Sequence, residues 1–198
     1  MKKIIYCLLP LLLLFTACEE TVEIGKYDNW QVRNEAFIDS LQQVYDAKTD
    51  PELFGVIDSR DKSQRIFFKK LPGSTIKENK SPFLTDSVNT FYRGMLINEA
   101  VFAKASPPKY YTTLYKELDV FDYNFSGDSP SEFDSFTTFK VSGVVNGWIE
   151  ILQRMKVGER WEIYIPWKSA YGSTAHQSIP AYSVLIFDVQ LEGIKEFI

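Results

Sequence analysis

The segment from Phe139 to Leu191 constrains the fold most, because short strand patterns alternate there with turn-forming residues and one short helical pattern. The clearest strand spans residues 183–193. Its large apolar side chains occupy alternate positions, as expected for the buried face of a strand: Leu185, Phe187, Val189 and Leu191. A short helix is predicted over residues 148–155, and Gly158 follows its end.

Further segments have strand character, with apolar and β-branched residues between turn formers. They span residues 64–71, 87–93, 136–141 and 160–166. Several strands with one short internal helix, and no internal repeat, indicate an α+β domain built on an antiparallel sheet. Residues 95–120 lack such a pattern, and we expect them to form a long excursion between sheet elements.

A second helical pattern begins after Asn29, a candidate N-cap, and ends before Asp50 and Pro51. Its apolar residues recur at spacings of three, four and seven: Trp30, Phe37, Leu41, Val44 and Tyr45. We expect this amphipathic helix to pack on its own domain. A dimerisation helix is the alternative.

The N-terminus has the layout of a secretory leader. Lys2 and Lys3 precede an apolar run over residues 4–15, which is too short to span a bilayer comfortably. Small residues then precede Cys18, which resembles a bacterial lipobox, where the cysteine becomes the lipidated first residue. Cys7 lies inside the run, so Cys18 has no disulfide partner. We therefore expect a lipid-anchored cell-envelope protein at the outer membrane, on its periplasmic or surface face.

The residues that follow Cys18 are acidic: Glu19, Glu20 and Glu23. This stretch resembles the surface-export signal of Bacteroidota lipoproteins, and a solvated tether is the alternative. The expected organisation is a leader at 1–17, a tether at 18–28, a helical extension at 29–63 and the principal domain at 64–198. That domain would contain an insertion at about 95–120.

Charge and composition exclude several classes of function. Removal of residues 1–17, which hold two lysines and no acidic residue, would change the formal charge from −4 to −6. This acidic balance gives no electrostatic case for binding nucleic acid. With one histidine and no spare cysteine, we expect no metal site and no cofactor.

A series of short motifs then follows in a fixed order. They are VVNGW at 144–148, MKVGER at 155–160, IP at 165–166, AYG at 170–172, IP at 179–180 and LIFDV at 185–189. Their order and spacing resemble the C-terminal half of FKBP domains, a family of peptidyl-prolyl cis-trans isomerases. Looser matches continue upstream at 91–94 and 120–122. The resemblance implies an FKBP-like antiparallel sheet wrapped around a short central helix.

The resemblance also implies an enzyme that assists the folding of exported proteins at X–Pro bonds in an apolar aromatic pocket. It assigns catalytic roles to Trp148, as the floor under the proline ring, to Tyr171, as a hydrogen-bond donor to a substrate carbonyl, and to Asp122, as a carboxylate near the twisting amide. It assigns the substrate-binding walls as follows: Tyr92, Phe121, Val144, Val145, Ile179 and Phe187. His176 falls where many members have a loop histidine, and we leave it outside the catalytic set.

Each assignment has an alternative without function. Aromatic residues at strand and helix spacing are usually core, a buried tyrosine often bonds to backbone, and an aspartate often caps a turn. Phe125 rivals Phe121 for the pocket wall, because the match at Phe121 requires residues 95–118 to be an insertion. A further aromatic that some members place before the central helix corresponds here to Thr137.

The expected partners are proline-containing polypeptides and the membrane, and macrolide ligands are expected from the family. The alternative function is a non-catalytic or weakly active binding module, or chaperone, for envelope proteins. Two features favour it: the insertion, and Ala181 where a second proline is common. The insertion could place its tyrosines over the pocket as a lid: Tyr110, Tyr111 and Tyr115.

Overall fold

The computed structural model describes residues 25–72, 74–99 and 118–195. The leader, Cys18 and most of the 95–120 segment, with its three tyrosines, therefore lie outside the described residues. Within the described ranges, no helix is both long enough and apolar enough to cross a membrane.

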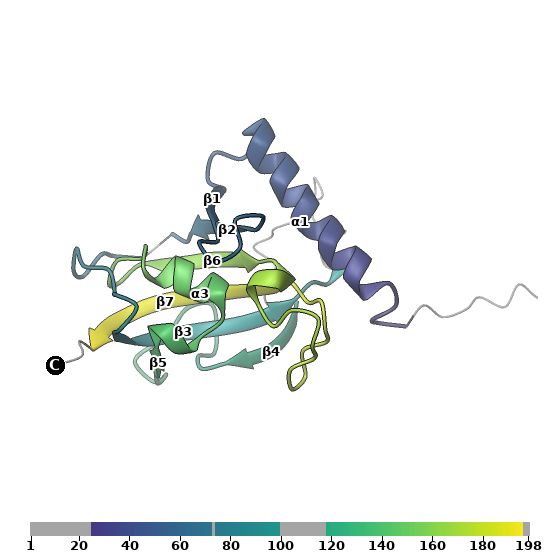
Figure 1. Cartoon of the computed structure of the whole chain (residues 1–198). Coiled ribbons are helices and arrows are strands. Elements are labelled where there is room, and N and C mark those ends of the chain that lie inside the picture. Colours follow the sequence, from purple (N-terminus) through teal and green to yellow (C-terminus); the bar gives the residue numbers. More distant parts are fainter. Residues whose placement is uncertain (1–24, 73, 100–117, 196–198) are drawn as a thin grey trace, which may run out of the picture.

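The described chain forms a seven-stranded sheet with the α+β architecture expected from the sequence (Figure 1). The helices are α1 (Trp30–Ala47) and α3 (Asn146–Leu152), with the 3-10 turns η2 (Val141–Gly143) and η3 (Trp167–Ser169). The strands are β1 (Phe54–Ile57), β2 (Arg65–Lys70), β3 (Ser87–Leu96), β4 (Asp119–Tyr123), β5 (Thr137–Lys140), β6 (Arg160–Ile165) and β7 (Leu185–Lys195).

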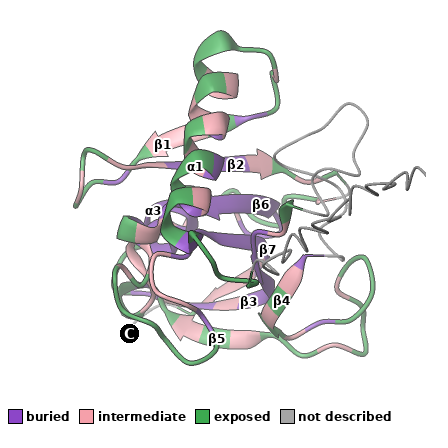
Figure 2. Ribbon diagram, turned by 90° about the vertical axis from the view of Figure 1, so that its right-hand side faces the viewer, coloured by how far each residue is buried: buried purple, intermediate pink, exposed green. Residues whose placement is uncertain are grey.

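Every strand pairing in the sheet is antiparallel. The order along the sheet is β1-β2-β6-β7-β3-β4, and β5 pairs with the first half of β3 while β4 pairs with its second half. The central strand β6 is buried throughout and β7 is buried from Leu185 to Val189, whereas β5 alternates between intermediate and exposed residues (Figure 2). The sheet is therefore covered on both faces at its centre and open at its edges.

The short helix α3 packs on one face of the sheet. A Cβ added to Gly147 would lie 2.4 Å from Cγ2 of Ile165, so only glycine allows this first turn to approach β6 so closely. Every residue of α3 after Asn146 is buried. The close approach fixes the depth at which the next residue, Trp148, sits above the sheet.

The long helix α1 packs against the opposite face of β2 and β6. Phe37 contacts the ring of Tyr164 at a centroid distance of 6.1 Å, and Tyr45 contacts Phe67 at 5.8 Å. Tyr164 and Phe67 are register partners, so their side chains lie on one face, while their neighbours in sequence face α3. Figure 1 shows α1 running obliquely beyond β1 and β2.

Buried hydrogen bonds fix α1 to the segment before β7. The Trp30 indole N–H donates to Oγ of Ser183 at 2.8 Å, and the backbone N–H of Val184 donates to Oδ1 of Asn34 at 2.7 Å. The prediction that this helix packs on its own domain is confirmed. Asn29, by contrast, is not a side-chain cap: it has a φ of 52° and makes no capping hydrogen bond.

The strands predicted from the sequence are confirmed within a few residues of their expected ends. Two strands were not predicted. β1 lies inside the range expected to be a helical extension and joins the sheet by pairing with β2. β4 lies at the opposite edge and pairs with β3. Both are short edge strands whose sequences lack clear alternation.

Candidate functional site

A cavity of about 340 Å³ opens between α3, the β3–β4 edge of the sheet and the loop that follows η3. Aromatic and aliphatic side chains dominate its lining. The lining residues are Tyr92, Phe121, Asp122, Phe139, Gly143, Val144, Val145, Trp148, Tyr171, His176 and Phe187. All the residues predicted for the site line this cavity, except Ile179.

The floor of the cavity is the indole of Trp148. Its side chain is 4% exposed and is surrounded edge-to-face by the rings of Tyr92, Phe139 and Phe187, at centroid distances of 5.8, 5.6 and 5.1 Å. Within the described chain, Nε1 of Trp148 has no hydrogen-bond partner. The indole therefore offers a flat apolar surface at the bottom of a cup of upright rings.

Glycine at position 94 lets two wall rings meet. A Cβ there would lie 2.5 Å from Cζ of Phe121 and 2.7 Å from Cε1 of Phe187, inside the contact limit of real side chains. The two rings instead pack edge-to-face at 5.6 Å, one from β4 and one from β7. The bulge in the β3–β4 pairing lies directly after Gly94, where it changes the direction of the strands.

The polar rim combines one carboxylate with two phenols. The Tyr92 hydroxyl donates to Oδ2 of Asp122 at 2.7 Å, which orients that carboxylate at the edge of the cavity. Burial raises the pKa of Tyr92 above its ordinary value, and the hydrogen bond to Asp122 adds to the shift. Burial also raises the pKa of Tyr171, and the negative charge of Asp122 contributes. Both phenols therefore remain protonated donors at neutral pH.

Tyr171 lies on the loop after η3 and is 38% exposed. Its ring stacks on the imidazole of His176 at a centroid distance of 4.1 Å and an interplanar angle of 10°. The loop is closed by two backbone hydrogen bonds of 2.9 Å between His176 and Ile179, one in each direction. His176, left outside the predicted catalytic set, thus lines the cavity and supports the ring of Tyr171.

Ile179 is the one predicted wall residue that is not among those lining the cavity. Its side chain is 5% exposed and belongs to the hydrophobic core, as does that of Trp148, and its backbone pairs with that of His176 beside the cavity. Its place in the substrate-binding wall stays a prediction.

Phe139 is a lining residue that sequence reasoning missed. It lies on β5 with Thr137, the position taken for the aromatic before the central helix, and its ring packs edge-to-face on Trp148. The rival Phe125 is excluded from the cavity. It is 2% exposed and lies against the guanidinium groups of Arg93 and Arg160, at 4.7 and 5.5 Å from its ring centroid.

Residues 108–192 match the sequence model of a family described as FKBP-type peptidyl-prolyl cis-trans isomerase. The chain is 36% identical over 115 residues to the FKBP-type 22 kDa peptidyl-prolyl cis-trans isomerase of Escherichia coli, an alignment that covers 58% of this chain and 44% of that protein. This chain carries an FKBP-type domain.

The chain is similar to a further relative. The macrophage infectivity potentiator of Trypanosoma cruzi is 41% identical over 88 residues, covering 44% of this chain and 42% of that protein. The chain thus spans less than half the length of these curated relatives.

Solved structures confirm the fold. A peptidyl-prolyl cis-trans isomerase from Pseudomonas syringae superposes with a TM-score of 0.56 at 19% identity, covering 87% of this chain and 98% of that one. FkpA from Escherichia coli has the same TM-score at 22% identity, covering 86% of this chain and 63% of that one. The coverage exceeds that of the FKBP-type family match, so the shared fold extends N-terminal to the matched segment.

Proposed function

We propose that this protein is a peptidyl-prolyl cis-trans isomerase that accelerates rotation about X–Pro bonds. The observation that carries the proposal is the cavity whose floor is the Trp148 indole and whose rim holds Asp122 and Tyr171. The X–Pro bond is a tertiary amide, and rotation about it is slow because the barrier is about 18–20 kcal/mol. No covalent bond has to be broken, so the site needs no nucleophile.

The cavity can lower this barrier by differential binding. Twisting the amide removes its resonance and its charge separation, so a dry aromatic cup favours the twisted state over the solvated planar one. In the proposed complex the proline ring lies on Trp148, and the Tyr171 hydroxyl donates to a substrate carbonyl. Asp122, oriented by its hydrogen bond from Tyr92, places negative charge beside the rotating amide.

The double variant Tyr171→Phe, Asp122→Ala is expected to lower kcat/KM by about 10-fold or more, equivalent to about 1.4 kcal/mol of transition-state stabilisation. A protease-coupled assay on a short Xaa-Pro peptide measures this. The matched control is Tyr123→Phe, which removes the hydroxyl of a neighbouring tyrosine that is 60% exposed and outside the cavity. A wild-type kcat/KM no higher than that of the double variant would contradict the catalytic proposal.

Titration with a macrolide of the kind that FKBP domains bind, combined with the isomerase assay, separates this proposal from the alternative, a non-catalytic or weakly active binding module for envelope proteins. The open cavity supports macrolide binding, which tryptophan fluorescence can report. Macrolide binding without isomerase activity would favour the binding module.

We further propose that the substrates are exported polypeptides and that the protein is anchored in the outer membrane through lipid on Cys18. The support is the apolar run and the small residues before Cys18, all outside the described residues. The proposed organisation is leader 1–17, tether 18–28, extension 29–63 and FKBP-type domain 64–198. The insertion in that domain would span residues 95–120.

Replacing Cys18 by Ala is expected to move the protein from the membrane fraction to the soluble fraction, because the acyl chains supply the anchoring energy, about 0.8 kcal/mol per buried methylene. Cell fractionation with immunodetection measures the distribution. Cys7→Ala is the control and should leave the protein in the membrane fraction. A Cys18→Ala protein that still sediments with membranes contradicts lipid anchoring at this residue.

A further inference from the structure

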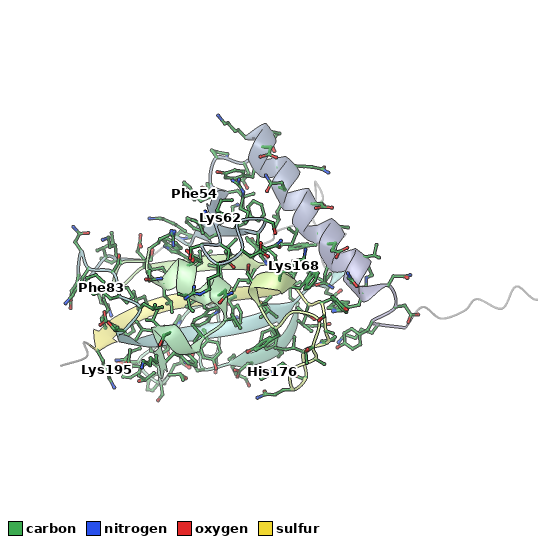
Figure 3. All side chains as sticks on the ribbon, viewed as in Figure 1. Phe54, Lys62, Phe83, Lys168, His176 and Lys195 are labelled. Atoms are coloured by element: carbon green, nitrogen blue, oxygen red, sulfur yellow. The ribbon has the colours of Figure 1, made fainter. Side chains whose placement is uncertain are left out.

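A second cavity, of about 570 Å³, includes in its lining the segment that immediately precedes the loop carrying Tyr171. Three segments form it: one side of α1, the β1–β2 hairpin and the segment from Pro166 to Lys168. We call this cavity the hairpin groove. Its lining residues are Glu35, Ile38, Asp39, Gln42, Ile57, Lys62, Ser63, Gln64, Arg65, Pro166, Trp167 and Lys168. Two of them, Lys62 and Lys168, are labelled in Figure 3.

The hairpin groove has opposite charges on its two sides. Helix α1 contributes the carboxylates of Glu35 and Asp39, and the hairpin and η3 contribute the cations of Lys62, Arg65 and Lys168. In the described ranges, no ion pair joins the two sides. Glu35 instead accepts a hydrogen bond from Gln31 on its own helix, and Lys168 lies 5.2 Å from the ring centroid of Trp167.

Apolar side chains lie between the charged sides: Ile38 from α1, Ile57 from the hairpin and the indole of Trp167. Ile57 is 41% exposed, which leaves its apolar surface available to a ligand. A site with apolar surface between acceptors on one side and donors on the other suits an extended polypeptide. Such a chain offers backbone N–H and C=O groups in alternation, and side chains of mixed polarity. Nucleic acid is disfavoured by the two carboxylates.

Trp167 connects the hairpin groove to the proposed catalytic cavity. Its carbonyl accepts hydrogen bonds from the N–H groups of Ala170 and Gly172, at 3.1 and 2.9 Å, on either side of Tyr171. Its ring packs edge-to-face on Tyr182 at 5.1 Å, and the N–H of Tyr182 donates to the carbonyl of Gly172. One wall residue of the groove thus holds both ends of the loop whose tip lines the cavity.

The hairpin is fixed to the same segment from below. The buried Ser169 hydroxyl donates to Oδ2 of Asp58 at 2.6 Å, and the hydroxyl and backbone N–H of Ser59 donate to the buried carboxylate of Glu150 on α3. These bonds connect the groove wall to the elements that position the cavity wall. A polypeptide that extends from the cavity past Tyr171 would therefore reach the segment that lines the groove.

We propose that the hairpin groove is an exosite for the client: it binds an extended segment of the same unfolded polypeptide whose prolyl bond occupies the Trp148 cavity. This inference rests on the proposed isomerase function and adds a substrate class to it. Long unfolded chains fill both sites, whereas short Xaa-Pro peptides fill the cavity alone. The exosite raises efficiency on long chains through local concentration, without changing the chemistry at the proline.

Two double variants test the proposal, and each leaves charges of mainly one sign in the hairpin groove. Glu35→Lys, Asp39→Lys makes it basic, and Lys62→Glu, Lys168→Glu makes it acidic. Each double variant is expected to lower kcat/KM for proline-limited refolding of an unfolded protein by about 5-fold, equivalent to about 1 kcal/mol. Activity on a short Xaa-Pro peptide should stay within about 2-fold of wild type, because the cavity is unchanged.

Two further variants complete the design. Combining all four substitutions exchanges the charges across the groove and should restore activity on the unfolded protein, since a chain of mixed polarity fits either orientation. The control Glu132→Lys, Lys195→Glu reverses two exposed charges outside the groove and should change neither activity; Lys195 lies at the far end of β7 (Figure 3). Groove variants that refold the protein at the wild-type rate, or lose both activities equally, overturn the exosite.

A binding measurement keeps this test separate from that of the isomerase. A fluorescein-labelled, proline-free, unfolded peptide of lysine, glutamate, threonine and valine reports on the groove by anisotropy, whether or not the protein is an enzyme. Wild-type binding that both double variants weaken by about 5-fold supports the exosite. Equal binding by wild type and variants refutes it. Absence of activity on the short peptide refutes only the isomerase.

Discussion

Replacing Asp188 by Ala is expected to lower the free energy of unfolding by about 3–5 kcal/mol, the usual cost of removing one partner from a buried ion pair. Asp188 is wholly buried on β7 and forms a two-pronged pair with Arg160 on β6. The guanidinium Nε donates to Oδ1 at 2.7 Å and Nη2 donates to Oδ2 at 2.5 Å. The alanine variant removes the carboxylate that accepts both of these hydrogen bonds from the buried guanidinium. The carbonyl of Asp128 also accepts a hydrogen bond from Nη2, at 2.6 Å.

Urea unfolding followed by circular dichroism measures the effect, with the slope m checked for constancy. The matched control is Glu192→Ala, which removes the acidic partner of the Lys77–Glu192 pair at the surface. That pair is half-exposed at its lysine end, so its loss should cost about 1 kcal/mol or less. Equal, small losses for the two variants would show that burial of the Arg160–Asp188 pair contributes little to stability.

The sequence predicted the central strands well because their signal is local. On β7 the large apolar residues occupy alternate positions and lie on the face of the sheet against which α3 packs. Every residue from Leu185 to Val189 is buried. The edge strands β1 and β4 were missed for a physical reason. They form by pairing with β2 and β3, and a strand of four or five residues whose outer side lacks a partner needs no internal alternation.

The site was predicted where a single element positions the residue, and less well where two elements must meet. Trp148 follows directly from the helix start at Asn146. Phe139 depends on the 3-10 turn η2 between β5 and α3, whose length decides whether position 137 or 139 meets the indole. Motif spacing alone does not reveal that turn.

In the loop after η3, too, the sequence does not reveal which side chains come into contact. Its sequence is polar, and His176 is exposed, as expected. Two hydrogen bonds between His176 and Ile179 nevertheless close the loop, and the imidazole stacks on the ring of Tyr171. The sequence does not reveal this stacking, which makes the omitted histidine a lining residue of the cavity.

The free energy of unfolding is also expected to contain a component that falls as pH rises from about 4.5 to about 7. Burial raises the pKa of Glu162 on β6 from 4.5 to about 7, although the Tyr164 hydroxyl, which donates to Oε1 at 2.7 Å, favours the ionised form. The charge of Asp188 raises this pKa, whereas Lys69 and Arg160 lower it.

The direction of this pH dependence follows from the number of protons that the folded and unfolded chains bind at Glu162. Below pH 4.5 both the folded and the unfolded chain hold the proton of Glu162, so the full contribution is present. Between pH 4.5 and about 7 the folded chain keeps a proton that the unfolded chain has released, so stability falls with rising pH. Above that range both forms are ionised and the contribution is lost. Its size is about 3 kcal/mol, since each pKa unit corresponds to about 1.4 kcal/mol.

Glu162→Gln should abolish this component, because the amide does not titrate, while its oxygen can still accept the hydrogen bond from Tyr164. Urea unfolding at a series of pH values gives the difference in stability between variant and wild type. We expect that difference to shift in favour of the glutamine variant by about 3 kcal/mol between pH 4.5 and 8. The exposed Glu132→Gln serves as the control and should give a flat difference. Parallel profiles for wild type and Glu162→Gln would mean that Glu162 is already ionised in the folded protein throughout this range. Its burial would then be offset by the surrounding cations Arg160 and Lys69.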